Sequence, residues 1–76
     1  MIKEADTMVR MRIGQKVAAL RKKKGLTQVQ LAKLANMDHV SISNIERGKG
    51  GCSIDSLEKI AKVLNCRVDL IKNYKQ

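Results

Sequence analysis

The stretch "LTQVQLAKLANMDHVSISNIERG", residues 26–48, decides the fold of this chain. It holds two short helical patterns that are separated by only three residues, Asn-Met-Asp at 36–38. Thr27, followed three residues later by Gln30, predicts a capping box at the start of the first helix. The buried face of that helix is predicted to consist of Leu31, Leu34 and Ala35, with the small Ala32 beside them.

Each residue of the intervening turn has a predicted role. Asn36 is expected to end the first helix, because asparagine is the residue that best tolerates the left-handed backbone conformation after glycine. The apolar Met37 is predicted to fill the corner, and Asp38 is predicted to cap the next helix. That second helix has only two strongly inward positions, Ile42 and Ile45, before a glycine ends it.

Two helices joined by so short a turn form a helix-turn-helix motif. The second helix of such a motif is poor in apolar side chains because most of its surface lies in the major groove of DNA. Ala32 is expected to face this second helix near the crossing point, where a larger side chain would push the two helices apart. The pattern therefore predicts a DNA-reading helix between Asp38 and Gly48.

A further helix is predicted before the motif, from about Met11 to Lys24, with Gly25 as its left-handed stop. Residues 1–10 would then be an N-terminal extension, and residues 11–76 the helix-turn-helix domain. The inward face of this helix is predicted to consist of Ile13, Val17 and Leu20.

The cleanest helical pattern follows the motif, between Ser53 as N-cap and Asn65 as left-handed end. The tail after it fits two patterns. The spacing of Val68 and Ile71 suits a short helix, whereas the alternation of Cys66, Val68 and Leu70 suits a strand. The inward face of the helix before the tail is predicted to consist of Leu57, Ile60, Ala61 and Leu64.

Composition narrows the classes of partner. A chain of 76 residues makes one small domain, and a domain of this size buries only about 60% of its unfolded surface. Sixteen Lys and Arg against seven Asp and Glu give a net charge of +9, which favours nucleic acid or an anionic membrane surface. Because Tyr74 is the single aromatic residue, a stacking platform for single strands is excluded and duplex is preferred. The basic residues are spread over several elements, which disfavours the membrane surface.

The first residues, "MIKEADTMVRMR", lack the apolar run of a signal peptide, and no segment approaches the length of a membrane span. We therefore expect a cytoplasmic protein. Cys52 and Cys66 are expected to be reduced thiols, because the helix predicted between them is about 18 Å long. A disulfide tolerates a Cα separation of only about 7 Å. Neither cysteine belongs to a cluster of zinc ligands.

No pattern for catalysis or for a cofactor is found. His39 is the single histidine, so neither a metal site nor a catalytic base is indicated. Ser41 and Ser43 lack the base that would activate a nucleophile. The loop "GKGG" at residues 48–51 lacks the phosphate-loop pattern. We expect a protein that is not an enzyme and has no metal or cofactor.

The sequence resembles a known family, the phage repressor and Cro type of helix-turn-helix regulators, also called the xenobiotic-response-element family. The stretches that carry the resemblance are "IGQKVAALRKKKGLTQVQLAKLANMDHVSISNIERGK" and "SIDSLEKIAKVLNCRVDLI". The resemblance implies an all-α, compact five-helix lambda-repressor-like domain. Asn36 departs from the glycine usual in the family. Leu70 stands where a polar residue is common, which favours a dimer-forming strand in the tail, as in some antitoxin members.

The resemblance also implies roles for particular residues. The residues expected to reach base edges, because they match the groove-facing positions of the recognition helix, are His39, Val40, Ser41, Ser43 and Asn44. The residues expected to contact DNA phosphates are Thr27, Gln28, Arg47 and Lys49. A structural ion pair is expected between Arg21 and Glu46.

The function predicted from the sequence is that of a sequence-specific double-stranded DNA-binding transcriptional regulator, acting as a dimeric repressor. Phosphate contacts would supply affinity, and the recognition helix would supply sequence choice. The alternative is an antitoxin or another protein-interaction module whose DNA binding is secondary. The partners expected are therefore double-stranded DNA, a second copy of the chain and, in the alternative, a toxin or other protein.

Overall fold

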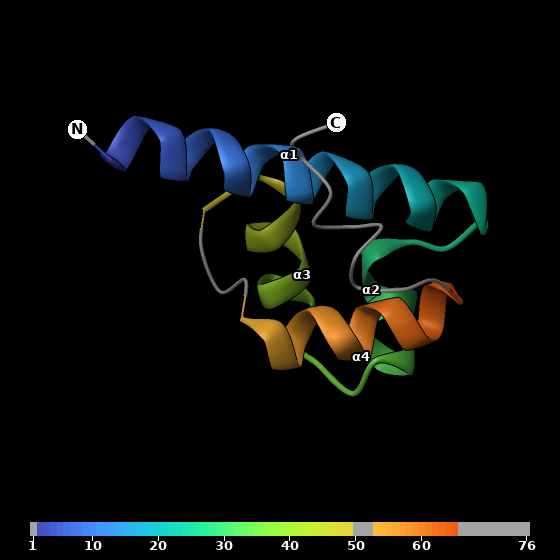
Figure 1. The fold of residues 1–76 in the computed structure, drawn as a ribbon. Coiled ribbons are helices and arrows are strands. Elements are labelled where there is room, and N and C mark those ends of the chain that lie inside the picture. The colour runs from blue at the N-terminus through green and yellow to red at the C-terminus, as the bar shows by residue number, and fades with distance from the viewer. Residues whose placement is uncertain (1, 50–52, 66–76) are drawn as a thin grey trace.

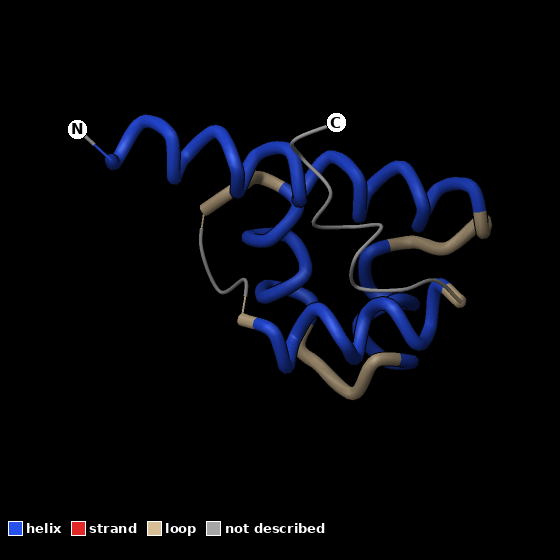
Figure 2. The backbone as a smooth tube through the Cα atoms, viewed as in Figure 1, coloured by secondary structure: helices blue, strands red, loops and turns tan. Residues whose placement is uncertain are grey.

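The structure, a computed structural model, describes residues 2–49 and 53–65. These residues form four α-helices (Figure 1). The helices are α1 (Ile2–Lys23), α2 (Gln28–Leu34), α3 (His39–Glu46) and α4 (Ile54–Leu64). Figure 2 shows α1, α2 and α3 joined by short loops, with no strand among the described residues. The all-α prediction is confirmed with four helices in place of five, since the tail expected to hold a fifth element, residues 66–76, lies outside the described residues.

Helix α1 is longer than predicted, because it begins at Ile2 and not near Met11. Residues 2–10 contain no glycine or proline, and Glu4, Ala5 and Met8 are among the better helix formers. Nothing in this segment therefore stops the helix. Figure 1 shows α1 lying across one side of the molecule, where it packs on α3 and on α4.

The core lies where the four helices meet. Its fully buried large side chains come from all four helices: Val17, Leu31, Ile42, Ile45, Leu57 and Ile60. Ala32, Ala35, Ala61 and Leu64 are buried beside them, and Leu20 and Met37 pack against this cluster as half-buried side chains. The inward positions predicted for α1, α3 and α4 are therefore confirmed, as is the role of Met37 at the corner.

Leu34 is an exception, because 61% of it is exposed. The prediction that it belongs to the buried face of α2 is wrong. The buried face of α2 is centred between Leu31 and Ala32, and Leu34 lies roughly 100° around the helix from that centre. Leu31, Ala32 and Ala35 therefore form the buried face, and Leu34 lies at its margin.

The predicted caps of α2, α3 and α4 are confirmed. The hydroxyl of Thr27 accepts the backbone N–H of Gln30 at 3.0 Å, and the backbone N–H of Thr27 donates to Gln30 Oε1 at 2.9 Å. Asn36 and Asn65 both have φ of 57°, in the left-handed region. Asp38 is the N-cap of α3 by its backbone, but its carboxylate accepts a hydrogen bond from the Ser41 hydroxyl and none from the helix backbone.

Gly14 allows the closest approach between α1 and α3. A Cβ at this position would lie 2.3 Å from the carbonyl oxygen of Ile45 and 2.6 Å from that of Glu46. Both atoms belong to the backbone, so no side-chain rotation could relieve the contact. The position of the last turn of α3 therefore depends on the absence of a side chain at Gly14.

Candidate nucleic-acid interface

Helix α3 has one buried face and one accessible face. Ile42 is fully buried and Ile45 is 2% exposed, so these two residues hold the helix on the core. His39 is exposed, and Val40 is exposed over 54% of its surface. The remaining predicted base-contacting residues, which are half-buried, are Ser41, Ser43 and Asn44.

Two local hydrogen bonds orient polar groups on α3. The Ser41 hydroxyl donates to Asp38 Oδ2 at 3.1 Å. Arg47 Nη2 donates to Asn44 Oδ1, also at 3.1 Å. An amide oxygen carries two lone pairs, so the bond to Arg47 leaves Asn44 able to accept a second hydrogen bond.

The predicted phosphate-contacting residues lie at the ends of the two motif helices. Thr27 and Gln28 form the start of α2, while Arg47 and Lys49 follow α3. Thr27, Arg47 and Lys49 are exposed and Gln28 is half-buried. The Thr27 hydroxyl accepts a hydrogen bond in the capping box. Arg47 and Lys49 are both exposed and charged, so they are the side chains of this group best suited to meet a polyanion.

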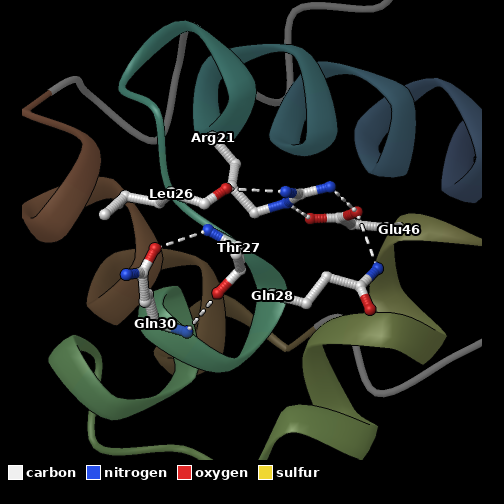
Figure 3. A network of polar contacts seen from close by, with 6 residues as sticks. All are labelled: Arg21, Leu26, Thr27, Gln28, Gln30 and Glu46. Atoms are coloured by element: carbon white, nitrogen blue, oxygen red, sulfur yellow. Dashed lines mark hydrogen bonds and ion pairs between the residues drawn. The ribbon is translucent and has the colours of Figure 1, made fainter.

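The expected ion pair between Arg21 and Glu46 is present. Arg21 Nε lies 2.7 Å from Glu46 Oε2, and Arg21 Nη2 donates to Glu46 Oε1 at 3.1 Å (Figure 3). The guanidinium also donates through Nη1 to the carbonyl oxygen of Leu26 at 2.7 Å. The two side chains are only 12% and 6% exposed. The end of α1 is thus tied both to the loop before α2 and to the end of α3.

Gln28 joins the same carboxylate. Its amide nitrogen donates to Glu46 Oε1 at 3.0 Å (Figure 3). The geometry therefore gives one of the predicted phosphate-contacting residues a bond within the protein. Arg21, Gln28 and Glu46 come from three different helices and meet at one point.

Comparison with known proteins identifies the family. Residues 17–71 match the model of the HTH_3 family, which is described as helix-turn-helix. The chain belongs to the HTH_3 family. The resemblance to the phage repressor and Cro type of DNA-binding regulator is thereby confirmed.

Two curated relatives of the HTH_3 chain are repressors by name. The immunity repressor protein of Bacillus phage phi105 is 41% identical over 61 residues, which cover 80% of this chain and 42% of the repressor. The competence pilus inhibition repressor of Acinetobacter baylyi is 46% identical over 61 residues, which cover 80% of this chain and 56% of that protein. The HTH_3 chain thus spans about half the length of these curated relatives.

A solved structure shares the fold closely. The crystal structure of the restriction-modification controller protein C.AhdI from Aeromonas hydrophila matches with a TM-score of 0.79 at 31% sequence identity. The match covers 82% of the HTH_3 chain and 94% of the controller protein. The likeness therefore extends over nearly the whole of that domain.

Two features of the HTH_3 chain were not predicted from its sequence. The first is the close approach at Gly14, for which a signal existed, since a glycine inside a helical pattern often marks a packing contact. The second is the hydrogen bond from Gln28 to Glu46, for which the sequence held no signal. Among residues 2–49 and 53–65, no group of side chains that could hold a metal ion is found, and no helix is long and apolar enough to cross a membrane.

Proposed function

We propose that the chain is a sequence-specific, double-stranded DNA-binding transcriptional repressor that acts as a homodimer. One observation carries the proposal: Ile42 and Ile45 fix α3 on the core, while His39 and Val40 on the same helix are exposed. A helix in this setting can enter the major groove. The repressor names of the two curated relatives support this function.

Affinity is proposed to come from charge. The chain carries a net charge of +9, and the cations that replace counterions on the phosphates include Arg47 and Lys49. Thr27 and Gln28 at the start of α2 complete the proposed contacts to the DNA backbone. These contacts place the protein on the duplex without reading its sequence.

Sequence choice is proposed to come from α3. Asn44 can pair with the N6 and N7 edge of adenine, and Val40 can pack on a thymine methyl group. His39, Ser41 and Ser43 complete the proposed set of base contacts. The side chains are short or compact, so α3 must lie deep in the groove to use them.

The proposed function is tested by selecting bound duplexes from a random library. We expect enrichment of one half-site, repeated about the two-fold axis of the site. Half-site centres are expected to lie about 34 Å apart, which is one turn of DNA. An antitoxin or other protein-binding module would be favoured if the chain alone enriched no duplex and bound DNA only together with a protein partner.

Asn44→Ala and Lys49→Ala are expected to weaken DNA binding in different ways. Loss of Asn44 should cost about 1–3 kcal/mol on the selected site and relax the preference at one base pair. Loss of Lys49 should weaken all duplexes alike and lower the salt slope by about one unit for the phosphate contact removed. The measurement is binding to the selected site and to a scrambled duplex across a salt series.

Each variant serves as the control for the other. If Asn44→Ala weakens both duplexes equally, Asn44 does not read sequence. If Lys49→Ala leaves the salt slope unchanged, Lys49 is a solvated cation. Both side chains lie outside the core, so unchanged melting temperatures are expected for both variants.

The chain is expected to sediment as a dimer at micromolar concentration. The dimer surface is proposed to include the end of α4 and the tail around residues 68–74, which lie outside the described residues. A small core and the apolar residues of this segment motivate the proposal. A monomer at high concentration, both with and without the selected duplex, would contradict it.

A further inference from the structure

The carboxylate of Glu46 is the point where the ends of three helices are joined. It accepts hydrogen bonds from Arg21 at 2.7 and 3.1 Å and from Gln28 at 3.0 Å. Its side chain is 6% exposed, so these bonds are shielded from water and are stronger than they would be at the surface. Figure 3 shows the guanidinium of Arg21 and the amide of Gln28 approaching the carboxylate from different sides.

The two donors hold Glu46 against different parts of the protein. Arg21 lies at the end of α1 and is itself bound to the carbonyl of Leu26, so it fixes Glu46 to the scaffold. Gln28 is the first residue of α2, and Glu46 is the last residue of α3. The bond between them therefore links the two helices of the motif directly, at the ends opposite to the turn of residues 36–38.

The angle between α2 and α3 is then held at two places. Near the turn it is held by apolar packing, with Ala32 and Met37 against the core. At the other end of the motif, away from this turn, the Gln28 amide donates to Glu46 and adds a directional contact. Apolar packing tolerates small sliding movements, whereas a hydrogen bond weakens steeply when its distance and angle change.

We propose that Gln28 is a positioning residue for sequence recognition: through Glu46 it sets the angle at which α3 enters the major groove. This role rests on the proposed function and goes beyond the phosphate contact expected for Gln28. The amide of glutamine has two N–H donors, so the bond to Glu46 leaves one for the DNA backbone. The bond from Gln28 to Glu46 thus joins the start of α2, which is proposed to contact the DNA backbone, to α3, which is proposed to read the bases.

The two roles of Gln28 lead to different losses. A lost phosphate contact weakens all duplexes alike, and because Gln28 is uncharged it leaves the salt slope nearly unchanged. A changed helix angle leaves the charges in place but misaligns Asn44 and Val40 with the base edges. It should therefore reduce the preference for the selected site over scrambled DNA, with little change in the salt slope.

The test is the variant Gln28→Met, which keeps the length of the side chain and removes its donors. Because the lost hydrogen bond is to a charged group, we expect the ratio of affinities for the selected and scrambled duplexes to fall about tenfold. The salt slope measured on scrambled DNA should change by well under one unit.

Gln30→Met is the matched control. Gln30 lies on the same helix and also makes one side-chain hydrogen bond, but this bond remains within the capping box. Gln30→Met should lower the melting temperature about as much as Gln28→Met does. It should leave the ratio of affinities for the selected and scrambled duplexes within about twofold of the wild type. This control separates a change in helix angle from a general loss of stability.

Gln28→Lys tests for rescue. The lysine ammonium can donate to Glu46, so the ratio of affinities should return toward that of the wild type. Any additional phosphate contact that the lysine makes raises the affinity for both duplexes and cancels in the ratio.

The positioning role is overturned if Gln28→Met weakens both duplexes equally, because Gln28 would then be only a phosphate ligand. It is also overturned if Gln30→Met reduces the ratio as much as Gln28→Met does. A wild-type chain with no preference for any duplex would refute the proposed function itself. That result is distinguishable because it is seen before any variant is compared.

Discussion

Replacing Gly14 by alanine is expected to lower the free energy of unfolding by about 3 kcal/mol, through overpacking of the contact between α1 and α3. The new Cβ would lie 2.3 Å from the carbonyl oxygen of Ile45. In the interior of an ordinary helix the same change stabilises by about 1 kcal/mol. The steric cost exceeds this gain because the opposing atoms are backbone, so the whole helix must move.

The measurement for Gly14→Ala is thermal unfolding, where we expect the melting temperature to fall by roughly 10–20 °C. Binding to the selected duplex should fall as well, since the displaced helix is α3. Gln15→Ala is the control, because Gln15 is the next residue of α1 and is exposed; its effect should stay within about 0.5 kcal/mol. A variant Gly14→Ala that melts above the wild type would show that α1 and α3 are not in contact at this position.

Arg21→Ala is expected to cost about 3 kcal/mol in the free energy of unfolding, while Arg21→Met should cost less. Alanine removes the cationic partner of a carboxylate that is only 6% exposed and leaves the Leu26 carbonyl without the guanidinium donor. Methionine removes the same charge but keeps an apolar chain where the arginine stem lies, so it recovers part of the packing.

Chemical denaturation of both Arg21 variants, with Lys22→Ala as the control, measures this difference. Lys22 follows Arg21 in α1 and is exposed, so its loss should change stability by less than about 0.5 kcal/mol. Equal and negligible effects of alanine and methionine at position 21 would refute the structural role of the ion pair. A larger loss with methionine than with alanine would refute the packing argument.

The candidate site was predicted from the sequence to different degrees. The inward positions of α3, Ile42 and Ile45, followed from their spacing, whereas the list of base-contacting residues came from the family resemblance. The pairing of Arg21 with Glu46 came from the family resemblance alone, since residues 25 positions apart have no local pattern that joins them. The roles of the individual side chains on DNA remain predictions.

The sequence by itself determined the helices and their ends. The signals for these helices involve residues only a few positions apart, so they can be recognised in the local sequence. They are the capping box at Thr27, the left-handed residues Asn36 and Asn65, and the helical spacing of the core positions. The start of α1 is an exception: it was predicted near Met11 but lies at Ile2, in a segment with no residue that breaks a helix. These features depend on residues close together in the chain and not on how the helices are placed.

Only the tertiary structure decided how the helices lie against one another. Leu34 fits the apolar spacing of α2, yet it is exposed because the contact with the core is centred between Leu31 and Ala32. The close approach at Gly14 joins residues 31 and 32 positions apart, Gly14 with Ile45 and Gly14 with Glu46. The bond from Gln28 to Glu46 joins residues 18 positions apart. Side-chain spacing within one helix does not specify the rotation or distance of its neighbour, so these contacts, which set the position of α3, exist only once the four helices have packed.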